Sequence, residues 1–181
     1  VTWTSSDDSI ATVSKDGKVK ALKAGNVTIT ASAGDKSASC SIKAVPASPA
    51  KFKARSAGTT SVKLTWGKAA GADKYKVYRA TSARGTYKLV KTTSSLSTTD
   101  RKLTTGKNYY YKVRTLGGRN FYSSYTAVAK VKPVPAKVTL KAKAGKRSAT
   151  LSWTKVSGAS GYKVYRATKK NGSYKRICTT T

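Results

Sequence analysis

The stretch SVKLTWGKAAGADKYKVYRATSARGTYKLVKTT, residues 61–93, decides the fold because it returns as SATLSWTKVSGASGYKVYRATKKNGSYKRICTT, residues 148–180. The two copies align without a gap at an offset of 87 residues, and 18 of 33 positions are identical. Short alternating runs of Thr, Val, Tyr and Ser favour strands over helices. A period of this length is typical of tandem domains and differs from the short solenoid repeats. We therefore expect an all-β chain built from tandem two-layer modules.

Two proline-containing segments divide the chain, VPASPA at 45–50 and PVPA at 133–136. Proline stiffens such connectors. We expect a first module at 1–45, a complete central module at 46–133, and a third module at 134–181 that is truncated after about four strands. Nothing in the third module matches residues 103–132. The chain is then either a fragment of a longer protein or a subunit whose missing strands come from another copy.

Alternation assigns the faces of the predicted strands, because successive side chains point to opposite sides. In the first module Val27 and Ile29 should point inward, and Cys40 should be a small core residue. Cys178 should be either exposed or covered by strands that follow. The inward set of the central module is Val62, Leu64, Trp66, Tyr75, Val77, Tyr109, Tyr111 and Val113.

The chain is strongly basic, with 37 Lys and Arg against 6 acids and a net charge of +31. Such a charge attracts polyanions, for which teichoic acid, acidic polysaccharide, nucleic acid and an acidic protein are the candidates. Many lysines sit at alternate positions, as in Lys141-Ala142-Lys143. That spacing also fits a solvated sheet face that resists edge-to-edge pairing.

The residue inventory argues against catalysis. The chain has no His and no Glu, and its six acids are all Asp. A Ser-His-Asp arrangement or a His-assisted cysteine is therefore impossible within these residues. Asp73 and Asp100 should both lie at turns, and two distant cysteines cannot form a zinc site. We expect no catalytic residue, metal or cofactor, and no membrane span.

Residues 3–42 resemble the group 2 bacterial Ig-like (BIG2) family. The matching pattern runs from Trp3 through SSD and IATV to the glycines Gly17 and Gly25, which we interpret as turn residues. In that family two more strands normally precede the Trp segment. The resemblance implies an extracellular protein, secreted or on the surface of a bacterium, and we expect a Gram-positive one. Asp7 and Asp8 should cap a loop.

The repeated stretch and the residues after it resemble the fibronectin type III (Fn3) family. The marks are a lone Trp in the second strand, G-x-x-x-Y-x-V-Y-R in the third, and L-x-x-G-x-x-Y-x-Y-x-V later. In the central module they are Trp66, Gly71, Tyr75, Val77, Tyr78, Arg79, Leu103, Gly106, Tyr109, Tyr111 and Val113. The third module repeats them as Trp153, Tyr162, Val164, Tyr165 and Arg166. The resemblance implies tandem Ig-like β-sandwiches, with Tyr109 as a tyrosine corner.

One outward row of the central module could bind a ligand. Tyr78, Tyr110, Lys112 and Arg114 should face solvent on one sheet, with Arg79 near its rim, and Tyr165 and Arg166 repeat two of them. Tyrosines beside cations can stack on sugars or hold anions, or they can simply support the sheet through cross-strand pairs. For nucleic acid, no recognition element accompanies the charge.

These observations favour a non-catalytic structural or adhesive segment, a stalk or spacer with anionic wall polymer or acidic glycan as its candidate ligand. The first alternative is a filament or layer subunit that self-associates by sharing strands between incomplete modules. The second is an accessory module of a cell-wall-active enzyme.

Overall fold

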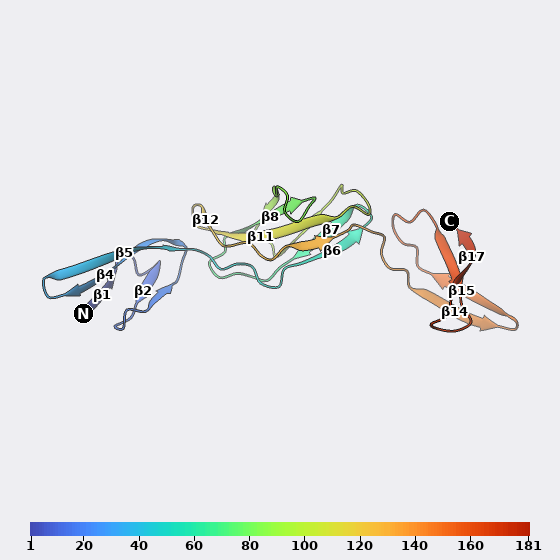
Figure 1. Cartoon of the computed structure of the whole chain (residues 1–181), viewed down its shortest axis with the longest axis horizontal. Helices are drawn as coiled ribbons and strands as arrows, with labels where there is room; N and C mark the ends of the chain where they lie inside the picture. The colour runs from blue at the N-terminus through green and yellow to red at the C-terminus, as the bar shows by residue number, and fades with distance from the viewer.

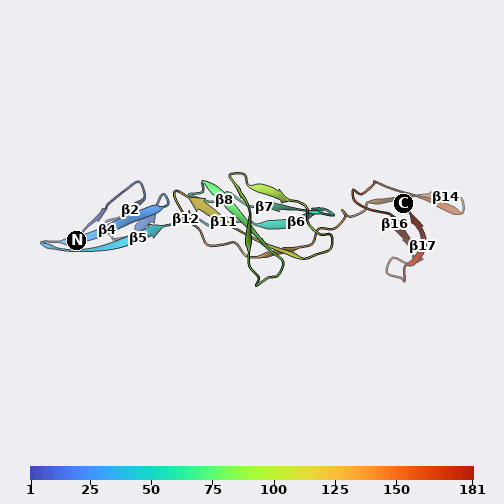
Figure 2. The ribbon, with the colours of Figure 1, turned by 90° about the horizontal axis from the view of Figure 1, so that it is seen from above.

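The computed structural model describes all residues from 1 to 181 and contains 17 strands and no helix. This confirms the all-β prediction. The strands form three groups that follow one another along the long axis of the molecule, and two perpendicular views show the same row (Figures 1 and 2). We call them the first, central and third modules.

The first module has a three-stranded antiparallel sheet in the order β1-β4-β5 and a separate hairpin, β2-β3. Its strands are β1 (Thr2–Ser5), β2 (Ala11–Val13), β3 (Val19–Ala21), β4 (Gly25–Ala33) and β5 (Lys36–Ala44). The small core consists of Ala11, Val27 and Ile29, with Trp3 packed against it. The predicted inward direction of Val27 and Ile29 is confirmed.

Two predictions for the first module are wrong. Cys40 pairs with the buried Ile29, yet its side chain is exposed, because the small core reaches β5 at Ile42 and no further along this edge strand. Gly25 is no turn residue. It begins β4, and a Cβ there would lie 2.6 Å from the end of the Ile10 side chain, so a larger residue would force Ile10 to shift.

Other local features of the first module follow prediction. Gly17 has a φ of 74°, which favours glycine, and the Trp3 ring lies against it. Asp7 Oδ1 accepts hydrogen bonds from the backbone N–H and hydroxyl of Ser9, at 2.9 and 2.6 Å. The predicted loop cap is therefore made by Asp7.

The central module is a two-layer sandwich with one sheet in the order β10-β7-β6 and the other in the order β12-β11-β8-β9, with β13 paired to β11. Its strands are β6 (Lys53–Gly58), β7 (Ser61–Thr65), β8 (Lys74–Ala80), β9 (Lys88–Thr93), β10 (Ser97–Asp100), β11 (Tyr109–Gly117), β12 (Phe121–Tyr122) and β13 (Ala129–Val131). The shortest of these eight strands, β12, has only two residues. Such a short strand offers no alternation to detect.

The core of the central module contains every residue that alternation placed inward. Leu64, Tyr111 and Val113 are completely buried. Leu103 joins this core, and the Tyr109 hydroxyl accepts a hydrogen bond from the Thr104 N–H at 3.0 Å. That is the contact expected of a tyrosine corner.

The third module has two separate two-stranded sheets, β14-β15 and β16-β17. Its four strands are β14 (Leu140–Gly145), β15 (Ser148–Trp153), β16 (Tyr162–Arg166) and β17 (Lys175–Thr180). Trp153 and Tyr162 lie with ring centroids 5.4 Å apart, and their counterparts Trp66 and Tyr75 are 5.6 Å apart. The repeated residues therefore form nearly the same local contact in both modules.

Global packing differs between the two copies. Trp66 is buried, whereas Trp153 is only half-buried and Leu140 is 53% exposed. A cavity of about 360 Å³ lies between the two sheets of the third module, lined by Val138, Leu140, Trp153, Tyr162 and Val164 among others. The repeated motif therefore forms the same aromatic contact in both modules, but only the central module buries this contact in a core.

Candidate functional site

The inner face of the central module holds a buried polar cluster around Asp100. One carboxylate oxygen of Asp100, Oδ2, accepts hydrogen bonds from Arg79 Nη1 and from the Tyr111 hydroxyl, both at 2.8 Å. Asp100 is 7% exposed. Its contact with Arg79 is the only ion pair within residues 1–181. The cluster joins both sheets because Asp100 belongs to β10, Arg79 to β8 and Tyr111 to β11.

Two predictions are corrected here. Asp100 lies in a strand and is buried, so it is no turn residue. Arg79 does not lie at the rim of the outward row: it pairs across the sheet with the buried Tyr111 and turns inward to Asp100. Charge pattern alone could not show this, because the partner is 21 residues away.

The buried cluster predicts a specific alkaline sensitivity. Burial raises the pKa of Tyr111 above its ordinary value of 10.0, and the hydrogen bond to Asp100 raises this pKa further. The stabilising contribution is complete below pH 10 and is lost as pH rises from there toward the folded-state pKa. Urea unfolding between pH 8 and pH 11 should show a smaller alkaline loss in Tyr111→Phe than in the parent chain. Equal pH slopes would contradict this assignment, since all other tyrosines and lysines are shared.

The outer face of the sheet that contains β8 and β11 carries an alternating set of tyrosines and cations. Lys112 Nζ lies 4.3 Å from the ring centroid of Tyr87 and 3.9 Å from that of Tyr125. The Arg114 guanidinium carbon lies 4.0 Å from the Tyr122 ring and 5.0 Å from the Tyr125 ring. These distances fall within the range of cation–π attraction.

Two further residues extend this set. Lys76 Nζ lies 5.0 Å from the ring centroid of Tyr122 and donates a hydrogen bond to its hydroxyl at 3.1 Å. The Tyr78 hydroxyl accepts a hydrogen bond from Arg114 Nη2 at 2.9 Å, and the Tyr78 ring contacts the Tyr125 ring edge-on. We call the whole arrangement the tyrosine–cation layer. Its members are Lys76, Tyr78, Tyr87, Lys112, Arg114, Tyr122 and Tyr125.

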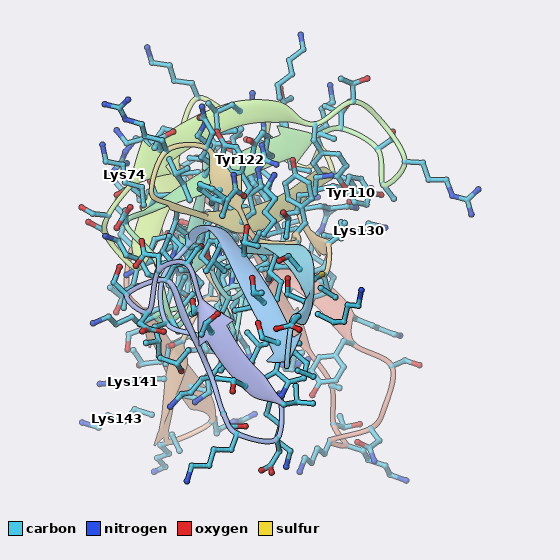
Figure 3. All side chains as sticks on the ribbon, turned by 90° about the vertical axis from the view of Figure 1, so that its left-hand side faces the viewer. Lys74, Tyr110, Tyr122, Lys130, Lys141 and Lys143 are labelled. Carbon is cyan, nitrogen blue, oxygen red and sulfur yellow. The ribbon has the colours of Figure 1, made fainter.

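The structure brings together three of the sequence-predicted candidates, Tyr78, Lys112 and Arg114, in this layer. Tyr110 lies beside it on β11, with Lys130 Nζ of β13 at 6.0 Å from its ring (Figure 3). In the third module Tyr165 and Arg166 are exposed. In the third module β16 pairs only with β17. Tyr165 and Arg166 therefore have no neighbouring strand like β11 that could complete a second tyrosine–cation layer within residues 1–181.

Sequence reasoning missed Lys76, Tyr87, Tyr122 and Tyr125 as members of the layer. Tyr122 and Tyr125 lie on the segment between β11 and β13, which runs beside β11 and is hydrogen-bonded to it. No strand alternation extends through this segment, so the direction of its side chains could not be predicted. The available signal for Lys76 was its position two residues before Tyr78, which places both on one face.

The remaining chemistry is limited. Within residues 1–181 no three His, Cys, Asp or Glu side chains gather closely enough to hold a metal ion. Both cysteines are free and exposed. The chain contains no helix with the length and apolarity that crossing a membrane requires.

Comparison with known proteins places these modules. Residues 1–43 match the family model of the bacterial Ig-like domain (group 2). An Fn3-like protein from Clostridium thermocellum is 30% identical, with 52% of this chain and 98% of that chain covered and a TM-score of 0.46. Residues 1–43 therefore form a group 2 bacterial Ig-like segment, and the chain is similar to Fn3 domains.

Other solved Fn3 structures are also similar to this chain. FN3tt shares 22% identity, covering 49% of this chain and 97% of FN3tt, with a TM-score of 0.44. The FN5 domain of Drosophila Lar shares 22% identity, covering 50% of this chain and 98% of that domain, with a TM-score of 0.40. No curated protein matches the chain. Fn3 modules host many activities, so function depends on the geometry above.

Proposed function

We propose that this chain is a non-catalytic spacer segment of an extracellular bacterial protein, with modules at 1–45, 46–133 and 134–181. The observation that supports it is the packing of both joints between modules. A spacer has to hold its two ends at a defined separation, and domains joined by flexible linkers do so poorly. The joints of this chain are held by contacts as well as by proline.

The first joint is packed around Gly117 at the end of β11. A Cβ on Gly117 would lie 3.3 Å from the Ala24 side chain of the first module and would collide with the carbonyl oxygen of Gly71. The connector itself is fixed, because the Ala47 carbonyl accepts a hydrogen bond from the Thr115 hydroxyl at 2.8 Å. Lys43 of β5 lies over the Phe121 ring of the central module at 5.6 Å.

The second joint is fastened by Ser56 of β6. Its hydroxyl donates to the Val134 carbonyl at 2.8 Å and accepts from the Val134 N–H at 2.9 Å. Pro133 is fully buried, and its carbonyl accepts from the Gly106 N–H at 2.9 Å. A Cβ on Gly158 of the third module would lie 2.6 Å from the Thr59 hydroxyl, so the two modules touch here.

The two native cysteines provide the test of this proposal. Cys40 lies in the first module, Cys178 lies in the third, and both are exposed. Spin labels on both should give a single narrow distance distribution by pulsed electron resonance. Ser56→Ala removes both hydrogen bonds to Val134, so its distribution should be broader. Ser152→Ala, at an exposed serine away from the joints, is the matched control.

A broad distribution in the parent chain would exclude a stiff spacer. An unchanged width in Ser56→Ala would show that the hydrogen bonds of Ser56 are not what holds the second joint.

A second candidate function, assembly by strand sharing, is favoured by the open cavity of the third module. Leu140 and its apolar neighbours face this cavity rather than a second layer. A strand from another copy could bury them, and burial of an apolar side chain contributes about 1.5–3 kcal/mol. Light scattering across a hundredfold range of concentration should then show oligomers that disappear in Leu140→Asp. A monomer at every concentration would reject assembly.

A further inference from the structure

The outer face of the central sheet is cationic without compensation. Along β8 and β11 it presents Lys74, Lys76, Lys112 and Arg114, and β13 adds Lys130. The central module has two acids, and neither forms an ion pair with a cation of this face: Asp100 is buried and pairs with Arg79, and Asp73 has no ion pair. Figure 3 shows Lys74, Tyr110, Tyr122 and Lys130 projecting from this part of the molecule.

The tyrosine–cation layer holds some of these charges in place. Lysine and arginine side chains normally lose about 2 kcal/mol of rotamer freedom when a ligand fixes them. Lys112 is already held by Tyr87 and Tyr125, and Arg114 by Tyr122 and Tyr125. Part of the ordering cost of anion binding is therefore met within the folded chain.

The held cations still have donors to offer. An ammonium has three N–H donors and a guanidinium has five, whereas Arg114 donates to one oxygen of the chain, the Tyr78 hydroxyl. The guanidinium is therefore incompletely satisfied by the chain itself.

The same contacts act against ligands that bind by stacking. Tyr87, Tyr122 and Tyr125 each already have a cation of this chain over the ring. A sugar ring or a nucleic-acid base would have to displace that cation or stack elsewhere. This argues against a neutral glycan and against single-stranded nucleic acid. It favours a polymer that brings charge and needs no aromatic platform.

We propose that the outer face of the central module binds a linear polyol-phosphate chain, the chemistry of a wall teichoic acid. Lys112 and Arg114 bind its phosphodiesters, and Tyr87, Tyr122 and Tyr125 are positioning residues. Alternate residues of a strand are about 7 Å apart, and a polyol-phosphate chain repeats its charge over a similar distance because a short carbon chain separates the phosphates. This inference adds a ligand to the proposed spacer, and it is tested independently of joint stiffness.

The decisive experiment compares two variants that each lose two positive charges. Lys112→Gln/Arg114→Gln alters the proposed site, whereas Lys141→Gln/Lys143→Gln alters exposed lysines of β14 in the third module. Titration calorimetry with purified poly(glycerol phosphate) at low salt is the measurement. The first variant should lose about tenfold in affinity, as removal of two phosphate contacts does, and the second less than about twofold. Equal losses would overturn the proposal, because attraction would then be diffuse.

Competing ligands supply the remaining arms. A polyuronate of matched charge and single-stranded DNA should bind more weakly than poly(glycerol phosphate), and a neutral glucan should not bind. Tighter binding of any of the three than of poly(glycerol phosphate) would overturn the assignment of the ligand. Binding that is insensitive to salt would do the same, because the proposed contacts are ionic.

The positioning role has its own readout. Tyr125→Leu keeps every charge but removes the ring over Lys112 and Arg114, so affinity should fall while the dependence on salt concentration stays the same. An unchanged affinity would overturn this role. If Lys112→Gln/Arg114→Gln does not fold by circular dichroism, Lys112→Gln compared with Lys141→Gln takes its place, with an expected loss of about threefold against an unchanged affinity in the control.

Discussion

Trp66→Ala should destabilise the central module by about 3–5 kcal/mol, because it removes the largest side chain of the core and leaves a cavity. Trp66 packs at 5.6 Å from Tyr75 within a cluster of ten buried residues. Small domains have a total stability of about 5–15 kcal/mol, so this substitution removes a large part of it. Urea unfolding followed by far-ultraviolet circular dichroism measures the loss.

The repeat provides the matched control for this prediction. Trp153 occupies the same place in the repeated stretch and makes the same contact with Tyr162, but it is half-buried beside an open cavity. Trp153→Ala should therefore cost about 1 kcal/mol, in the range of ordinary single substitutions. Similar losses at the two positions would show that the local motif, rather than the buried core, carries the stability.

Asp100→Ala should produce the second large effect, a loss of about 3 kcal/mol. It leaves the Arg79 guanidinium and the buried Tyr111 hydroxyl without their shared acceptor, and breaking a buried pair from one side costs about 3–5 kcal/mol. The expected loss lies at the lower end because the Arg79 side chain is 36% exposed and can turn toward water. The free energy of unfolding in urea is again the measurement.

Two companion variants interpret the Asp100 result. Asp100→Asn keeps an acceptor for Tyr111 but removes the charge that holds Arg79, so its loss should be intermediate. Asp35→Ala removes an exposed carboxylate in the turn between β4 and β5 and should stay within about 0.5 kcal/mol. A loss in Asp100→Ala no greater than in Asp35→Ala would contradict a structural role for the cluster.

Much of the fold could be predicted because its determinants are local. Alternation identified Leu64, Trp66, Tyr111 and Val113 as core residues, and all four are buried in the central module. The repeat at an offset of 87 residues also predicted that Tyr162 would behave like Tyr75. In both modules this tyrosine hydroxyl accepts a backbone N–H, from Ala69 at 3.0 Å and from Val156 at 2.7 Å.

The candidate site could be predicted only in part. Tyr78, Lys112 and Arg114 were placed correctly on one face because a strand of period two fixes the direction of each side chain. Arg79 was misplaced because its partner, Asp100, comes from the opposite sheet. Tyr122 and Tyr125 were missed because they lie on a segment without regular alternation that runs beside β11.

The sequence by itself determined which segments form the longer strands, which side most of their residues face, and that the central stretch recurs. Only the tertiary structure decided whether a face is covered. Cys40 faces the same way as buried Ile29 and is exposed, and Trp153 repeats the contact of Trp66 without its burial. The physical reason is that direction follows from the geometry of one strand, whereas burial requires a second layer from distant parts of the chain.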